Sequence, residues 1–205
     1  MKRLMSLFLV LVCIFALASC SDTLTLEQMV ANSEPHVVKT LTTVITGEEV
    51  FHGTYITTVD GNDFTFEYSY EKYADIDEAA SNYITTVEGV VYYKDGKYSE
   101  DGENWSLVNP GVDDKSVKLN LDEKNFTEYI VSEDQTSLVA TLSAENSELV
   151  LGRKINASGD ITLTVKTNGL YLTMVTVTYA TEDGEVRIDT SYTYKVEEDD
   201  LDVAE

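Results

Sequence analysis

Three stretches of this chain alternate apolar and polar side chains so regularly that they dictate β-structure. They are residues 64–71, 161–166 and 186–195. Successive side chains of a β-strand point to opposite faces of a sheet, so an alternating run buries one face and exposes the other. The most regular of the three, FTFEYSYE at residues 64–71, places an aromatic ring at every second position. The sequence therefore predicts strands that bury one face.

Short turn dipeptides separate the predicted strands. Asp-Gly and Asn-Gly pairs tolerate the positive φ angles that tight hairpin turns require. They occur at Asp60-Gly61, Asp95-Gly96, Asp101-Gly102, Asn168-Gly169 and Asp183-Gly184. We therefore expect an antiparallel sheet built from consecutive hairpins. Within residues 170–179 the apolar parity reverses midway, which predicts a β-bulge and a bend in the sheet.

Two helices accompany the predicted strands. The first begins at a capping box formed by Thr25 and Gln28. Its apolar face is made by Leu26, Met29 and Val30. Beyond an interruption at Pro35, three further apolar residues are expected to continue that face: Val37, Val38 and Leu41. The second helix is predicted at residues 144–151, with Ser143 as its N-cap and Gly152 as its C-terminal cap.

The predicted fold class is α+β and mostly β. We expect a single large curved antiparallel sheet, a half-barrel, with an N-terminal helix and a short inserted helix on its concave face. Residues 26–205 contain no Ser/Gly-rich linker and no low-complexity tract, so they are predicted to form one domain.

The first twenty residues have the pattern of an export signal. Lys2 and Arg3 precede an apolar run over residues 4–18, which is shorter than the roughly 20 residues of a membrane-spanning helix. Its end, Leu17-Ala18-Ser19-Cys20, resembles the bacterial lipobox, in which the cysteine receives a diacylglycerol and the signal is cut before it. The alternative is an ordinary secretory signal with an incidental cysteine.

The lipobox resemblance sets the expected covalent structure and location. Residues 1–19 would be a lipoprotein signal peptide, and residues 20–25 a lipidated tether. Apart from Cys13 in the signal, Cys20 is the only cysteine, so the mature chain can form no internal disulfide. We expect an exported protein, lipid-anchored in the cell membrane or outer membrane, with its domain on the extracytoplasmic side. The lipid on Cys20 is the only expected covalent group, and no other cofactor is predicted.

The combination of a lipobox, an N-terminal helix, a large antiparallel sheet and an inserted helix resembles the lipoprotein-localisation-factor (LolA/LolB-like) fold and the related mycobacterial lipid carriers. One segment, VYYKDGKY at residues 91–98 followed by DGENW at residues 101–105, is similar to a hairpin of many small lipoproteins with this predicted fold. In that fold a half-open barrel wraps helices around an apolar cavity for acyl chains. The resemblance therefore implies a carrier of lipid or of lipoprotein acyl chains.

The candidate cavity-lining residues are the apolar members of the alternating strands: Phe64, Phe66, Tyr68, Tyr70, Leu163, Val165, Ile188 and Tyr192. Two interpretations apply to them. They pack as an ordinary core beneath the helices, or they line a lipid cavity in which tyrosines supply an apolar body with a polar tip.

The formal net charge of −23 excludes some partners. Such a surface repels the phosphate backbone of nucleic acids and anionic lipid headgroups. The acidic run at residues 197–200 has no EF-hand spacing and is interpreted as a solvated surface, so no metal site is predicted.

Motifs that carry catalysis are not evident. Neither His36 nor His52 has a recognisable nucleophile or metal context, and no phosphate loop or nucleophile elbow occurs. We therefore expect a monomeric, non-enzymatic protein that binds or shuttles an apolar ligand. The alternative is an envelope lipoprotein with a fully packed core that binds protein or glycan partners or senses envelope state. A carboxylate-based hydrolase is a third and weaker hypothesis, because carboxylates are abundant here and some glycosidases use them in pairs.

Overall fold

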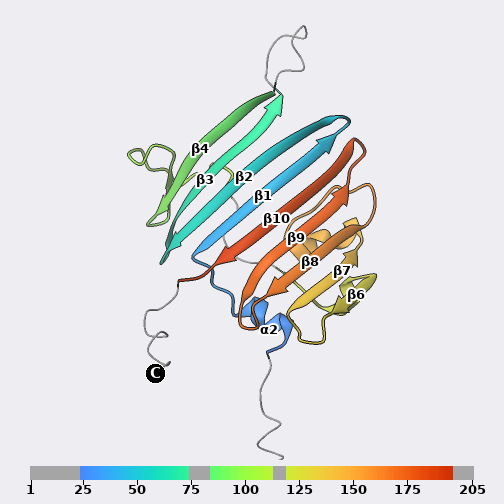
Figure 1. The fold of residues 1–205 in the computed structure, drawn as a ribbon. Helices are drawn as coiled ribbons and strands as arrows, with labels where there is room; N and C mark the ends of the chain where they lie inside the picture. The colour runs from blue at the N-terminus through green and yellow to red at the C-terminus, as the bar shows by residue number, and fades with distance from the viewer. Residues whose placement is uncertain (1–23, 74–83, 113–118, 196–205) are drawn as a thin grey trace, which may run out of the picture.

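A computed structural model describes residues 24–73, 84–112 and 119–195 of the chain. These residues form one open antiparallel sheet of ten strands with two short α-helices (Figure 1). The predicted fold class is therefore confirmed. The leader, Cys20 and the acidic run at residues 197–200 lie outside the described residues.

The elements follow one another along the chain as α2 (Leu26–Ala31), β1 (Val37–Thr46), β2 (Glu49–Asp60), β3 (Asp63–Tyr73), β4 (Ile84–Lys94), β5 (Lys97–Ser99), η2 (Glu123–Asn125), β6 (Glu128–Val131), β7 (Ser137–Leu142), η3 (Ala144–Asn146), α3 (Ser147–Leu151), β8 (Ile161–Thr167), β9 (Leu172–Ala180) and β10 (Gly184–Thr193).

The sheet consists of two meanders joined edge to edge. Strands β1 to β5 form one meander and strands β6 to β10 the other, and the spatial order is β5-β4-β3-β2-β1-β10-β9-β8-β7-β6. The seam is the long antiparallel ladder between β1 and β10, which pairs Val37 with Thr193 at one end and Thr46 with Gly184 at the other. The first and last strands of the sequence therefore meet in the middle of the sheet, and the short strands β5 and β6 lie at its edges.

The N-terminal helix forms as expected at its start and differs at its end. Thr25 Oγ1 accepts from the Gln28 amide at 3.3 Å, while Gln28 Oε1 accepts from the Thr25 amide at 2.8 Å, which completes the capping box. The expectation that the helix continues beyond Pro35 is wrong, because α2 ends at Ala31 and β1 begins at Val37. The run from Val37 onward is rich in β-branched residues, which lose side-chain freedom in a helix and pack well in a strand.

The inserted helix forms where the sequence predicted it. A 3₁₀ turn, η3, leads into α3, and Gly152 closes the helix in the left-handed region with φ 68°. Ser143 stands at the N-cap of the 3₁₀ turn but makes no side-chain capping bond. In Figure 1 this segment lies behind strands β8 and β9.

The predicted β-bulge lies in β9 against β8. Lys166 pairs with Met174 while Thr167 pairs with Leu172, so Thr173 is the extra residue. Its hydroxyl donates to the Lys166 carbonyl at 3.0 Å. The bulge lets Leu172 and Val175 both face the core, which explains why the apolar parity of the sequence reverses.

The turn dipeptides were predicted with mixed accuracy. Asp95-Gly96 is a two-residue hairpin turn in which both residues have positive φ, 50° and 80°. The turn assigned to Asp60-Gly61 is centred one residue later, because Asp60 pairs with Asp63 and Gly61 alone has positive φ. Asp101-Gly102 lies in the loop that follows β5 rather than between two paired strands.

The sheet has an inner face, on which the helices pack, and an outer face. Cross-strand pairing places alternate residues of each strand on one face throughout the sheet. Helices α2 and α3 cover the inner face of β7 to β10 and form the main core cluster with it. The side chains in this cluster with no exposed surface are Leu138, Leu142, Val150, Ile161, Leu163, Val165 and Leu172.

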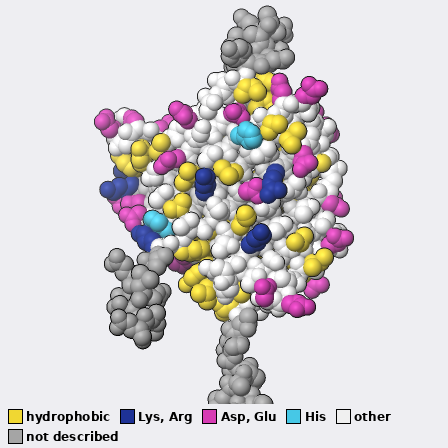
Figure 2. Space-filling model, viewed as in Figure 1, with side chains coloured by type: hydrophobic (Ala, Val, Ile, Leu, Met, Phe, Trp, Pro, Cys, Tyr) yellow, Lys and Arg dark blue, Asp and Glu magenta, His cyan; other side chains and the backbone are white. Residues whose placement is uncertain are grey.

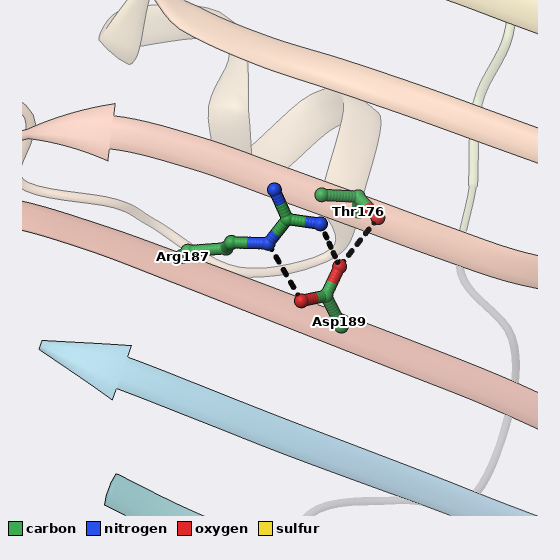
Figure 3. Close-up of polar contacts among 3 residues, drawn as sticks. All are labelled: Thr176, Arg187 and Asp189. Carbon is green, nitrogen blue, oxygen red and sulfur yellow. Dashed lines mark hydrogen bonds and ion pairs between the residues drawn. The ribbon is translucent and has the colours of Figure 1, made fainter.

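The outer face mixes polar, charged and apolar side chains, with Leu41, Ile45 and Val50 each at least 40% exposed, and it carries a cluster of linked charged side chains. Figure 2, viewed as in Figure 1, shows basic and acidic side chains dispersed among uncharged ones on this face. The Arg187 guanidinium donates to both carboxylate oxygens of Asp189, at 2.7 and 2.9 Å, and the Thr176 hydroxyl donates to the same carboxylate at 2.7 Å (Figure 3). These three side chains link β9 to β10 beside the seam.

Within the described ranges, no helix is both long and apolar enough to span a bilayer.

Candidate functional site: an aromatic face on strands β2 to β4

The eight predicted cavity-lining residues share the inner face but lie in different surroundings. Leu163 and Val165 have no exposed surface, and Ile188 is 7% exposed, all within the main core cluster. Tyr192 packs against the same cluster, and burial raises the pKa of its hydroxyl. These four residues are therefore part of the packed core beneath the helices.

The aromatic residues of β3 lie farther along the inner face. Phe64 is 8% exposed and packs with Val91 and Val112 in a second, smaller cluster. Phe66, Tyr68 and Tyr70 are only half-buried. Helices α2 and α3 contribute residues to the main cluster and none to this one. The structure therefore separates the predicted set into a closed core and a partly open aromatic row.

A tyrosine of β2 completes this row. Tyr55 lies nearly parallel to Phe66, with ring centroids 6.3 Å apart and an angle of 20°, and nearly parallel to Tyr70, at 6.4 Å and 19°. Tyr68 is 5.9 Å from Phe66 and 6.2 Å from Tyr70, tilted by 35° and 32°. Four rings thus lie side by side with modest mutual tilt. We call Tyr55, Phe66, Tyr68 and Tyr70 the aromatic face.

Two glycines make room for these rings. Tyr68 pairs across the ladder with Gly89 of β4, and a Cβ on Gly89 would lie 2.4 Å from the Tyr68 hydroxyl oxygen. Tyr55 covers Gly53 of its own strand, where a Cβ would lie 3.0 Å from the ring. Glycine at these positions lets a neighbouring aromatic ring approach the backbone closely.

Tyr55 was not among the residues predicted for the inner face, although the sequence contains a signal that places it there. Strand β2 lacks the regular alternation that marks β3, so its inward-facing residues are not evident from periodicity. The hairpin turn after Asp60 fixes the register, however, and pairs Tyr55 with Tyr68. The position of the turn therefore identifies the tyrosine, provided that its centre is placed at Gly61 and Asn62 rather than one residue earlier.

At the Phe64 end, the row reaches a polar-rimmed hollow of about 650 Å³. Its aromatic wall is Phe64, Tyr93 and Tyr98, with Phe64 and Tyr93 stacked at 4.8 Å. Its polar lining includes Asn62, Asp63, Asp95 and Asn109. A second hollow, of about 500 Å³, is lined mostly by outer-face residues of β2 to β4 and does not extend the aromatic face.

The chemistry available at the aromatic face is non-covalent. Burial raises the pKa of Tyr55, with a smaller contribution from Tyr70, so its hydroxyl stays protonated at neutral pH. The two histidines lie elsewhere: His36 precedes β1, and exposed His52 donates its amide to Glu71 on the outer face. Within the described part of the chain, no three His, Cys, Asp or Glu side chains are placed to hold a metal ion. The rings can stack and exclude water, and the hydroxyls can donate and accept hydrogen bonds.

No protein-family model matches the chain, and no curated protein matches it significantly.

Proposed function

We propose that this protein is a lipid-anchored protein of the bacterial cell envelope that binds an apolar ligand, such as a lipid or an acyl chain, without catalysis. Cleavage after residue 19 and acylation of Cys20 attach it to the membrane, and the aromatic face is its ligand surface. The likeness to lipoprotein-localisation factors stays a prediction, and the proposal does not depend on it.

The observation that carries the proposal is the half-buried row of rings on a sheet face that helices close over β7 to β10. Strands β7 to β10 bury this face under helices, whereas Phe66, Tyr68 and Tyr70 remain partly open. Apolar surface left open over a few hundred Å² usually marks a binding site. Aromatic rings provide a large contact area with few rotatable bonds, so they lose little conformational entropy when a ligand binds.

The dimensions of the row indicate an elongated ligand. From Phe64 to Tyr70 the strand advances six residues, which is roughly 20 Å at about 3.3 Å per residue. One end opens into the polar hollow, where Asp63 and Asp95 disfavour a phosphate group. The ligand that fits best is an apolar chain whose polar end carries hydroxyl or amine groups.

The test uses the full chain purified from cells. Native mass spectrometry with lipid extraction should detect co-purifying lipid, and the fluorescent fatty acid cis-parinaric acid should bind saturably. Phe66→Asp places a charge in the row and should abolish both signals. Tyr92→Asp is the matched control, because Tyr92 belongs to the adjacent strand, is 37% exposed and faces the outer side. Wild-type protein that carries no lipid and binds no probe would contradict the proposal.

Lipid attachment has its own readout. Intact-mass analysis of membrane-extracted protein should find an acylated chain that starts at residue 20, and Cys20→Ser should leave the uncleaved precursor. Secretion of an unmodified mature chain would contradict the proposed lipid anchor. It would not bear on the proposed ligand surface, which the lipid-binding experiment tests separately.

A glycan is the second candidate ligand, and the ring orientation favours it. Phe66 and Tyr70 each lie within 20° of parallel to Tyr55, and ring faces aligned in this way are a surface on which sugar rings can stack. A soluble chito-oligosaccharide is the probe for this candidate. Saturable binding of the sugar that Phe66→Asp removes, together with absence of lipid, would assign the surface to glycan and replace the lipid proposal.

A further inference from the structure

A group of exposed apolar side chains lies at the end of the sheet that carries α2. At this end β1 begins, β4 ends, β9 begins and β10 ends, and we call it the α2 edge. In Figure 1 it is the lower end of the sheet, where α2 lies. Two separate loops contribute the side chains, and their exposed fractions are Trp105 39%, Leu107 79%, Val108 74%, Leu170 58% and Tyr171 39%.

The first loop is directed toward the α2 edge by its pairing with β5. Tyr98 and Ser106 exchange backbone hydrogen bonds of 2.8 Å in an antiparallel bridge. Strand β5 runs away from the α2 edge, so the chain beyond Ser106 runs back toward it. Leu107 and Val108 therefore lie beside the turn between β4 and β5.

Hydrogen bonds hold this loop in shape on both sides of its apolar tip. The Asp101 carboxylate accepts from Ser99 Oγ and from the amides of Glu103 and Asn104, all at 2.8–2.9 Å. Beyond the tip, Asn109 Oδ1 accepts from the amides of Gly111 and Val112, at 2.9 and 2.8 Å. A loop constrained in this way presents Leu107 and Val108 to solvent, and exposed apolar surface of this kind marks an interaction site.

The second loop, between β8 and β9, is fixed against the N-terminal helix. Asn168 Oδ1 accepts from the amides of Leu170 and Tyr171, at 3.0 and 2.8 Å. The Tyr171 ring stacks on Tyr194 with centroids 4.9 Å apart. The next residue along the chain, Leu172, donates its amide to Ser33 Oγ just after α2. Leu170 is therefore exposed close to the point where the N-terminal segment joins the domain.

At the opposite end of the sheet, the described residues have lower exposure. The large hydrophobic side chains exposed there are Ile45, Val50, Tyr73 and Ile84, and among these described residues none exceeds 43%. Leu107 and Val108, at 79% and 74%, are the most exposed large hydrophobic side chains in the described part of the chain.

We propose that the α2 edge is a membrane-docking surface that inserts Leu107, Val108 and Leu170 into the interfacial region of a lipid bilayer, with Trp105 and Tyr171 at headgroup level. The surface consists of five side chains on two loops, whereas a stable protein interface needs a shape-matched area of roughly 800 Å² per partner. A lipid bilayer is fluid, so a protein surface can insert into it without a complementary shape. Trp and Tyr are enriched where proteins meet the membrane–water interface.

The position of the N-terminus selects the bilayer as the occupant. The chain leaves the domain at Thr25, directly before α2, and the five residues from Ser21 to Thr25 connect Cys20 to the helix. Five residues extend to roughly 17 Å at about 3.3 Å each, so an acyl group on Cys20 holds the α2 edge at the membrane. The orientation of the domain at the membrane rests on the proposed lipid anchor. Contact between the α2 edge and lipid can be measured whether or not Cys20 is acylated.

The polar-rimmed hollow opens at the same edge. It is lined by Gly61, Asn62 and Asp63 of the turn between β2 and β3, and by Asp95 and Gly96 of the turn between β4 and β5. A ligand drawn from the bilayer therefore reaches the end of the aromatic face without crossing open water. The net charge of −23 predicts docking on zwitterionic rather than anionic lipid.

Trp105 is the only tryptophan in the chain, so its fluorescence reports on this loop alone. The full chain is reconstituted into phosphatidylcholine vesicles with and without phosphatidylcholine brominated near the top of its acyl chains. Trp105 emission should shift to shorter wavelength and be quenched by the brominated lipid. The double variant Leu107→Asp and Val108→Asp should lose both effects. Adding phosphatidylglycerol to the vesicles should weaken them.

Leu170→Asp tests the second loop, and its matched control is Leu149→Asp. Leu149 is 57% exposed, nearly the same as Leu170, but belongs to α3 rather than to the α2 edge. Leu170→Asp should reduce the quenching of Trp105 and Leu149→Asp should not. Unquenched Trp105 in vesicle-bound wild-type protein, or full quenching in the double variant, would overturn the inference. These readouts are independent of parinaric acid binding, so failure of docking and failure of ligand carriage are distinguishable.

Discussion

Gly89 lies beneath the aromatic face, and Gly89→Ala tests how that face is built. The new Cβ would lie 2.4 Å from the Tyr68 hydroxyl oxygen and 2.6 Å from its ring carbon Cζ, where ordinary contacts begin near 3.4 Å. The Tyr68 ring must therefore move by about 1 Å. The obstructed atoms are the far end of a side chain and not backbone, so we expect the ring to swing away while the β3·β4 ladder remains intact.

Two opposing contributions determine the stability of this variant. Tyr68 contacts Phe66 and Tyr70, and an aromatic pair contributes about 0.5–1.5 kcal/mol beyond its buried area. Replacing glycine by alanine restricts the unfolded chain and restores about 0.4–1 kcal/mol. We expect a net loss of about 1 kcal/mol in the free energy of unfolding. Loss of one ring contact should weaken ligand binding by about tenfold at most.

Urea denaturation gives the stability, and titration with cis-parinaric acid gives the affinity. Gly53→Ala is the matched control, because its Cβ would lie 3.0 Å from the Tyr55 ring and requires a shift of only a few tenths of an ångström. It should therefore retain more of the affinity than Gly89→Ala. Wild-type affinity in Gly89→Ala would show that the Tyr68 ring is not part of the ligand surface. A loss above about 3 kcal/mol in the free energy of unfolding would show that the new Cβ displaces the backbone of β3 and β4 rather than the Tyr68 ring.

Two further predictions concern the seam between the meanders. Gly184→Ala places a Cβ 1.7 Å from the backbone carbonyl oxygen of Ile45, and a backbone atom cannot move aside as a side chain can. Urea denaturation should therefore show a loss of about 3 kcal/mol in the free energy of unfolding, and a loss below about 1 kcal/mol would contradict this. The Arg187 guanidinium, with help from the Thr176 hydroxyl, lowers the pKa of Asp189. The ionised Asp189 therefore adds to the free energy of unfolding at pH values above the ordinary carboxyl pKa near 3.9, and this stabilisation is lost as pH falls through the folded-state pKa. Asp189→Asn should therefore cost about 1 kcal/mol at most near pH 7 and progressively less in acid, measured as urea midpoints against pH with exposed Asp160→Asn as the control; an equal cost at every pH would refute it.

The local signals in the sequence predicted most of the elements. Alternation identified β3, β8 and β10, and the parity reversal in residues 170–179 identified the bulge at Thr173. These predictions succeed because a strand that buries one face has a strict chemical requirement at every second residue. The capping box at Thr25 succeeds for a similar reason, since it satisfies backbone groups by contacts only three residues apart.

Features that depend on long-range pairing were not predicted. The segment at Val37, Val38 and Leu41 is compatible with a helical stripe when considered alone, and only its ladders with β2 and β10 make it a strand. The seam between β1 and β10 joins residues about 150 positions apart, as the hydrogen bond between Thr40 and Thr190 illustrates. Tyr55 was missed for the related reason that its role follows from a partner strand and not from its own neighbours.

The partial exposure of the aromatic face follows from the dimensions of the elements. Ten strands spaced about 4.8 Å apart span roughly 43 Å, whereas a helix with its side chains is about 10 Å wide. Two helices, of six and five residues, can therefore cover only about four strands, and the main core cluster lies over β7 to β10. The inner face of β2 to β4 needs another cover, and its residues at Tyr55, Phe66, Tyr68 and Tyr70 are aromatic rather than polar. A sheet of this width with so little helix thus leaves an apolar surface for something other than α2 and α3, which is why we expect a ligand there.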